Sequence, residues 1–171
     1  MVLAAVGSVS LWVAYLGIRE QTAENRRSAN SFRLSLSVDL CLKLDERFSS
    51  HSFRCLRSAA ARALLESTDL SEAEEVFDYF DTVGELVKSG ALTPEIVHSF
   101  FFHWINLYWN AGKNYILDMR KEAALLWEGF EYVYNEVTLI ERQRDPSSQD
   151  LAPSAQRLRI QLNDELSIPD S

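Results

Sequence analysis

Apolar residues recur three or four positions apart through most of the chain, and this spacing predicts an all-α protein. Proline and glycine interrupt helices, and they are rare here: the chain has 4 prolines and 6 glycines. Beyond residue 48 the pattern predicts four helices, which cover residues 53–64, 71–87, 93–116 and 123–141.

Residues suited to helix ends flank three of these predicted helices. Ser50 is placed to cap the first, and Ser71 and Glu74 have the spacing of a capping box at the start of the second. Gly90 follows the second helix, where a residue without a side chain adopts the left-handed conformation most easily. Thr93, which a proline follows, is placed to cap the third. Local residue chemistry therefore predicts the same boundaries as the periodicity.

The segment from Phe32 to Leu44 has two interpretations. Its apolar residues alternate with polar or small ones, which is typical of a β-strand. The same residues form rows four positions apart, which is typical of a helix buried on most sides. Because the other β-rich stretch, residues 132–140, has a better helical pattern, a strand here would lack a partner. We therefore expect a helix.

The first 18 residues contain no charged side chain. A helix of this length is about 27 Å long, close to the thickness of the hydrocarbon core of a bilayer. Trp12 and Tyr15 lie near its C-terminal end, where aromatic side chains favour the membrane interface. We therefore expect residues 1–18 to form a single transmembrane anchor.

The basic residues nearest to this segment all follow it, namely Arg19, Arg26, Arg27 and Arg33. By the positive-inside rule, the N-terminus lies outside and the rest of the chain lies in the cytoplasm, at the inner membrane. A secretory signal peptide is the alternative, but the segment shows neither a basic start nor a small-residue cleavage site. In the cytoplasm the two cysteines are expected to be free thiols.

Composition divides the remainder of the chain into two parts. Residues 19–143 are expected to form one cytoplasmic helical domain, a bundle of about five helices. Residues 144–171 are expected to form a flexible acidic tail, since they hold three prolines and no aromatic residue. Four apolar residues of this tail have helical spacing, so an amphipathic helix that forms on a partner is the alternative; they are Ala155, Leu158, Leu162 and Leu166.

The formal net charge of −8 is concentrated in residues 69–85, which carry seven carboxylates and no basic residue. Four of these carboxylates share one face of the predicted helix and form what we call the acidic stripe: Glu74, Asp78, Asp81 and Glu85. Because like charges at this spacing repel, a basic protein partner, a divalent cation or the arginines of residues 47–62 are candidate binding groups. A solvated acidic face is the alternative. The acidic balance argues against nucleic-acid binding.

The predicted helix over residues 93–116 is the most aromatic part of the chain. We call the following five residues the aromatic set: Phe100, Trp104, Tyr108, Trp109 and Trp127. They form either a ligand pocket or part of the hydrophobic core.

Motifs for catalysis are absent from the sequence. It contains no Gly-rich phosphate loop, no nucleophile elbow and no H-E-x-x-H motif. The cysteines and histidines do not have the spacing of a metal site, and no cofactor is expected. A hydrolase that uses carboxylates of the acidic helix is the most distant alternative.

Five motifs occur in an order that resembles a known family. They are R-E-Q-T (residues 19–22), L-D-E-R-F (44–48), F-D-T-V-G-E-L-V-K-S-G (80–90), Tyr108–Trp109 and W-E-G-F-E (127–131). This order resembles a bacterial family of single-span membrane proteins that is catalogued only as a domain of unknown function. The resemblance implies a membrane-tethered cytoplasmic helical domain and carries no catalytic residue or ligand.

Together these features favour a non-enzymatic interaction or regulatory module at the inner membrane. Its expected partners are the membrane and another protein chain, which can be a second copy of the same protein. The main alternative is a ligand-sensing helical domain that uses the aromatic set as its pocket.

Overall fold

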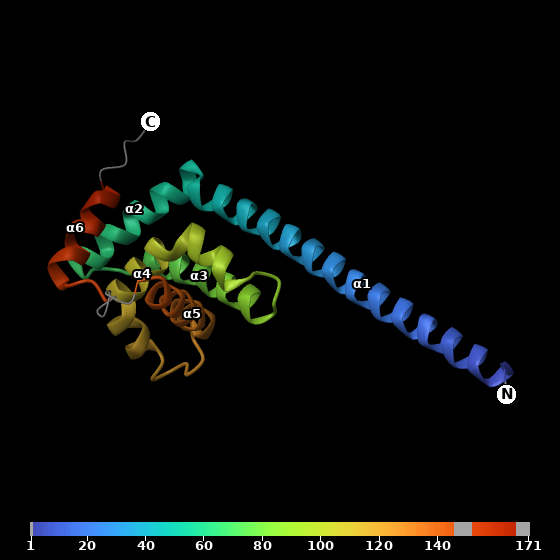
Figure 1. The fold of residues 1–171 in the computed structure, drawn as a ribbon. Helices are drawn as coiled ribbons and strands as arrows, with labels where there is room; N and C mark the ends of the chain where they lie inside the picture. The colour runs from blue at the N-terminus through green and yellow to red at the C-terminus, as the bar shows by residue number, and fades with distance from the viewer. Residues whose placement is uncertain (1, 146–151, 167–171) are drawn as a thin grey trace. The chain divides into compact units, whose positions relative to one another are not determined.

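The computed structural model describes the backbone of residues 2–145 and 152–166, and the side chains from residue 21 onward except for residues 22, 23 and 26. Every regular element in this part of the chain is a helix (Figure 1), which confirms the all-α prediction. The helices are α1 (Val2–Ser49), α2 (His51–Glu66), α3 (Ser71–Lys88), α4 (Pro94–Met119), α5 (Glu128–Arg144) and α6 (Ala155–Leu166).

Helix α1 has 48 residues and joins three predicted segments into one element. It contains the predicted anchor, the polar stretch that follows and residues 32–44, so the helical interpretation of that last segment is confirmed. Cys41 and Phe48 are buried, whereas Leu42 is 50% exposed. Apolar residues thus lie on both faces of α1, which explains why the sequence alternates as a strand does.

Among the residues that the structure describes, no helix combines the length and the apolar character needed to cross a membrane. The side chains of residues 1–20 lie outside the described part. The span over residues 1–18 therefore stays a prediction.

The chain forms two compact units, residues 1–36 and residues 37–171. In the first unit every described side chain is exposed, including three large apolar ones, Phe32, Leu34 and Leu36. The second unit, which we call the helical domain, contains the end of α1 and helices α2 to α6.

An aromatic cluster around Phe48 attaches the end of α1 to the rest of the helical domain. The Phe48 side chain is 1% exposed, and its ring centroid lies within 5.6 Å of five other rings: Phe53, Tyr79, Phe80, Phe101 and Trp104. The Tyr79 hydroxyl also donates a hydrogen bond to the Leu44 carbonyl at 2.8 Å. Such ring contacts add to the free energy of apolar burial.

Helices α3 and α5 approach each other most closely at two glycines. A Cβ atom added to Gly84 would lie 1.8 Å from the carbonyl oxygen of Gly129, so the two backbones are in contact there. A Cβ atom added to Gly129 would lie 2.5 Å from the carbonyl oxygen of Asp81. Both positions therefore require glycine for steric reasons.

Three predicted helix ends are found at the expected residues. Ser50 is the N-cap of α2 and accepts a hydrogen bond from the Phe53 amide. Gly90 has a φ of 73° just after α3. Thr93 is the N-cap of α4, but its side chain makes no capping bond, and its amide donates to the Ser37 hydroxyl at 3.1 Å.

The predicted capping box at the start of α3 is wrong. Asp69 accepts the hydrogen bond from the Ser71 amide at 3.1 Å, and the Ser71 hydroxyl lies against Glu72. Glu74 instead accepts a hydrogen bond from the hydroxyl of Tyr115 on α4. A tertiary contact has replaced the local one.

Helix α5 begins five residues later than the periodicity predicts. Residues 120–127 form turns, and Trp127 has a φ of 54°, which a regular helix does not allow. The side chain of Arg120 stabilises these turns, because its Nε donates to the Leu126 carbonyl at 2.7 Å and its Nη2 to the Trp127 carbonyl at 3.0 Å.

The expectation of a flexible tail is wrong for residues 155–166. They form α6, which packs against α2 and α4 (Figure 1). Leu162 is 4% exposed and Glu165 is 5% exposed. The partner of this amphipathic segment is therefore the chain's own helical domain. The remainder of the predicted tail, residues 146–151 and 167–171, lies outside the described residues.

Candidate functional site

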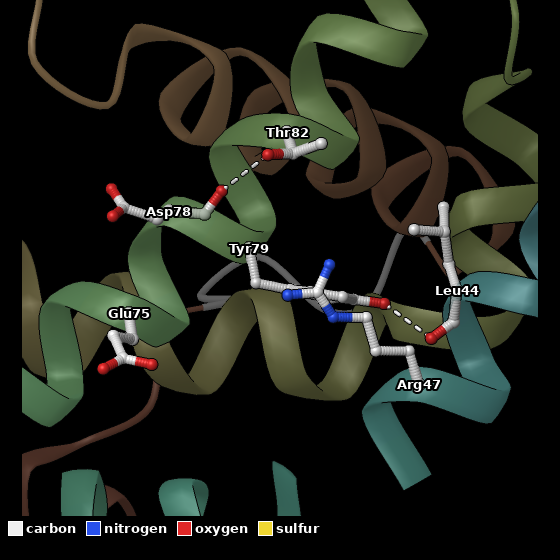
Figure 2. Close-up of a pocket in the computed structure, with 6 residues that line it drawn as sticks. All are labelled: Leu44, Arg47, Glu75, Asp78, Tyr79 and Thr82. Carbon is white, nitrogen blue, oxygen red and sulfur yellow. Dashed lines mark hydrogen bonds between the residues drawn. The ribbon is translucent and has the colours of Figure 1, made fainter. Parts of the chain in front are cut away.

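A cleft of about 240 Å³ lies between the end of α1 and the exposed side of α3 (Figure 2). Its walls are formed by Leu44, Arg47, Glu75, Asp78, Tyr79 and Thr82. The guanidinium carbon of Arg47 lies 5.9 Å from the centroid of the Tyr79 ring, over which it is placed. Burial is the main cause that raises the pKa of Tyr79, so this phenol stays protonated and donates to the backbone.

The charges in the cleft suit a small zwitterionic molecule. Arg47 comes from α1 and Glu75 comes from α3, so a cation and a carboxylate line one opening. The carboxylate of Asp78 points away from Arg47 and accepts a hydrogen bond from the Trp127 indole (Figure 2). An arginine binds carboxylates through paired hydrogen bonds, while carboxylates bind ammonium groups. Asp78 is recognisable in the sequence as part of the acidic stripe, whereas Arg47 is only one of several basic residues there.

The acidic stripe faces α5 and the turn before it. Asp81 accepts a hydrogen bond from the Phe130 amide at 3.1 Å, and Asp78 accepts one from the Trp127 indole at 2.7 Å. Phe130 belongs to the first turn of α5, whose amides lack helical partners. Asp81 therefore caps α5 from another helix, and Gly129 leaves room for it.

The two ends of the stripe also have partners within the chain. Glu74 accepts the hydroxyl hydrogen bond of Tyr115, which is the main cause that raises the pKa of Tyr115 to about 12. Glu85 forms an ion pair with Lys88 at 2.9 Å, and Lys88 lies 3.3 Å from Glu128 as well. The groups that bind the stripe are thus aromatic hydroxyl and N–H donors, a helix terminus and a lysine, and none of them is an arginine of residues 47–62.

The aromatic set does not gather around one space. Trp104 contacts Phe48 of α1, whereas Trp127 contacts Phe77 of α3. Trp109 stacks on Tyr134 of α5. Tyr108, Trp109 and Trp127 are buried within the core, and Phe100 is 36% exposed. The members are therefore packed in separate ring contacts.

A buried charge cluster lies where α6 meets α2 and α4. The side chains of Arg57 and Glu165 are each 7% exposed, and the Arg57 Nε lies 3.3 Å from a Glu165 carboxylate oxygen. The hydroxyl of Tyr108 lies 3.5 Å from the same oxygen. The guanidinium carbon of Arg57 lies 4.3 Å from the ring centroid of Phe48 and 4.4 Å from that of Trp104. The two ring centroids are themselves only 5.6 Å apart, so the planar cation lies against both rings at once rather than between them.

Sequence reasoning missed Arg57 as a functional residue, although a signal was present. On α2, Arg57 follows Phe53 by four residues and precedes Ala60 by three, so it occupies an apolar face. A charged residue at such a position is either paired or involved in binding.

His98 links α4 to α5. Arg144 donates a hydrogen bond to its Nδ1 at 3.0 Å, so the proton of the neutral ring is on Nε2. Nε2 lies 2.7 Å from a carboxylate oxygen of Glu141. Phe102 stacks on the ring. Both ring nitrogens of His98 therefore have partners within the chain, and the residue connects the two helices.

Cys41 and Cys55 both lie in the described part of the chain and are not joined by a disulfide there. Cys41 is buried, and this burial is the main cause that raises its pKa to about 11. Cys55 is exposed, and its sulfur lies 3.7 Å from His51 Nε2. Among the described residues, no cluster of three or more His, Cys, Asp and Glu side chains could hold a metal ion.

The chain was compared with models of known protein families. The model of DUF4760, a domain of unknown function, matches residues 4–137. The chain belongs to this family. The DUF4760 match contains Phe48, Arg57 and Trp104 and ends before α6, so it excludes Glu165. The match confirms the resemblance to a family that is catalogued only as a domain of unknown function. The single membrane span stays a prediction. No curated protein and no solved structure matches the chain.

Proposed function

We propose that this protein is a membrane-anchored cytoplasmic module that acts by binding another protein chain, without a catalytic step of its own. The observation that carries the proposal is the exposure of three large apolar side chains on α1. Phe32 is 70% exposed, Leu34 is 54% exposed and Leu36 is 56% exposed. Phe32 and Leu36 are four residues apart and share one face of α1, whereas Leu34 points to about the opposite face. Exposed apolar side chains on one helix face are typical of a protein-binding segment.

A second copy of the chain is the partner that fits this segment best. Asn25, Ala29, Phe32 and Leu36 are spaced by four, three and four residues, which is the spacing of a coiled-coil seam. Two copies anchored by residues 1–18 would enter the membrane in the same direction, so their α1 helices would be parallel. Confinement to one membrane also raises the effective concentration of the two α1 helices. A short seam binds weakly, so its pairing depends on this higher concentration.

The native Cys55 provides a test of the anchor and its orientation. Cells would be treated with a maleimide that does not cross membranes, before and after permeabilisation, and the membrane fraction would be washed with alkaline carbonate. We expect the chain to stay in the membrane fraction and Cys55 to react only after permeabilisation, because it is exposed while Cys41 is buried. Cys55→Ser is the control for labelling. Carbonate release, or labelling of intact cells, would contradict the proposal.

Disulfide trapping tests the seam. In a Cys55→Ser chain, Phe32→Cys places a thiol on the seam, and Arg33→Cys places one about 100° around the same helix. We expect oxidation of membranes to yield a disulfide-linked dimer from the first variant and little from the second. Equal yields from the two variants, or none from either, would rule out pairing through this face.

The cleft beside Arg47 supports a second candidate function, the sensing of a small zwitterion such as a free amino acid. A panel of amino acids screened by thermal shift would test it on the full chain. A binding amino acid should raise the melting temperature of wild type and of Lys43→Gln, which changes an exposed lysine on α1 outside the cleft. It should not raise that of Arg47→Gln. A shift that Arg47→Gln retains would exclude the cleft as the site.

A further inference from the structure

Helix α6 packs on the surface formed by α2 and α4, and we call this contact surface the groove. Leu162 is buried in this contact, and Leu158 and Leu166 are half-buried, four residues before and after it. Glu165 completes the buried face and reaches Arg57. The groove therefore receives a helix through three leucines at i, i+4 and i+8 and one carboxylate at i+7.

The floor of the groove is built to bind a carboxylate in an apolar setting. The guanidinium of Arg57 lies against the rings of Phe48 and Trp104. The hydroxyl of Tyr108 lies 3.5 Å from the Glu165 carboxylate oxygen and 3.3 Å from the Arg57 carbonyl. Burial keeps the pKa of Tyr108 well above its ordinary value, so this hydroxyl acts as a donor. These four residues lie within the DUF4760 match, whereas α6 lies outside it.

Several features of α6 make its hold on the groove weak. Only two of its 12 residues are buried. The Arg57 Nε and the Gln161 side-chain oxygen are both buried, and neither makes an aligned hydrogen bond to a described protein group. A desolvated ion pair without good hydrogen bonds contributes little net stability. Moreover, a 12-residue helix is marginal on its own, so α6 unfolds when it leaves the groove.

We propose that this groove is a binding site for an acidic amphipathic helix of a partner protein, and that α6 is its built-in competitor. The partner helix carries apolar residues at the positions of Leu158, Leu162 and Leu166 and a carboxylate at the position of Glu165. A partner with an apolar residue in place of Gln161 binds more tightly than α6 does, because it leaves no buried amide unpaired. This inference rests on the contacts of α6 alone and does not require the membrane anchor.

The test uses a fluorescent peptide of residues 152–168 and the full chain. Leu162→Asp in the chain removes α6 from the groove, and Ile160→Asp is the matched control, since Ile160 is 54% exposed on the same helix. We expect fluorescence anisotropy to show the peptide binding Leu162→Asp about tenfold more tightly than wild type or Ile160→Asp, because an open groove needs no displacement. A peptide with Glu165→Ala should bind more weakly, because it loses the group that contacts Arg57 and Tyr108. Equal affinity for all three chains, or no binding to any, would overturn the proposal.

Hydrogen exchange on the wild-type chain gives a second readout that needs no chain variant. A peptide with Gln161→Leu, added in excess, should speed exchange of the α6 amides and leave those of α3 and α5 unchanged. Unchanged α6 exchange at saturating peptide would overturn the proposal. A concentration-dependent dimer in which α6 stays protected would overturn it as well, because it would identify the α6 of a second copy as the occupant.

Discussion

Helices α5 and α6 are attached to the same helical domain by different means. Helix α5 packs on α3 with backbone contact at Gly84 and Gly129, and the amide of Phe130 donates to Asp81. Helix α6 relies on a few leucines and on the buried pair of Arg57 and Glu165. At α5, the carboxylate of Asp81 accepts a hydrogen bond from a helix-terminal amide that has no partner within its own helix. At α6, the pairing of Arg57 with Glu165 removes two charged groups from water. A carboxylate therefore strengthens one contact and adds little to the other.

The largest effect is expected from closing the space between α3 and α5. In Gly84→Ala the new methyl group would meet the Gly129 backbone, which has no flexible end to move away. We expect the free energy of unfolding to fall by about 3 kcal/mol, as measured by urea denaturation. Asn135→Ala, at an exposed position of α5, is the control and should change it little. A loss as small as that of the control would show that the two backbones are not in contact.

A smaller effect is expected when the cap of α5 is removed. Asp81→Ala leaves the Phe130 amide without its acceptor, and we expect a loss of about 1 kcal/mol in the free energy of unfolding. Asp81→Asn keeps an acceptor oxygen and should retain most of the stability. Chemical denaturation of the two variants side by side measures the difference. If Asn and Ala were equally destabilising, the charge rather than the hydrogen bond would explain the role of Asp81.

The attachment of α6 should depend on pH. Burial raises the pKa of Glu165, and its neighbours Arg57 and Tyr108 oppose this shift while Asp164 adds to it. Docked α6 thus binds a proton more tightly than free α6 does, so docking is strongest below the ordinary glutamate pKa and weakens as the pH rises through the raised one. Exchange protection factors of the α6 amides should fall over this range, and Glu165→Gln should flatten the change. Protection that rises with pH would contradict the assignment.

The smallest effect is expected from the surface ion pairs between α3 and α5. Lys88 is within 3.3 Å of Glu128 and 2.9 Å of Glu85, but the side chains of both carboxylates are 58% exposed. Exposed pairs contribute about 0.5 kcal/mol or less. Lys88→Ala should therefore shift the urea midpoint by less than Asp81→Ala does. A larger shift would mean that the contact of α5 depends on charge more than on backbone packing.

Local patterns predicted most helices but misplaced the contacts made between them. Ser50 and Gly90 are found at the helix ends where the sequence predicts them, because each acts on backbone groups within a few residues. Glu74 was expected to bond to its own helix start, and it binds Tyr115 instead. The start of α5 was misplaced for the same reason, since distant Asp81 caps it.

The candidate sites likewise combine features that nearby residues determine with contacts between separate helices. The acidic stripe was visible in the sequence because four carboxylates share one helix face. Lys88, the partner of Glu85, is local, but the partners of the other three carboxylates come from residues 115–130 and could not be read locally. The cleft beside Arg47 and the groove around Arg57 each combine residues from separate helices. No spacing rule within one helix connects such residues.

The sequence by itself determined the all-α class, most helix ends and the concentration of acidic charge, because these depend on periodicity and on contacts within a helical turn. Only the tertiary structure decided that α6 packs on the domain and that Asp81 caps α5. It also showed that Arg57 lies against two aromatic rings. These features depend on which faces meet, and that choice is set by close packing among residues far apart in the chain.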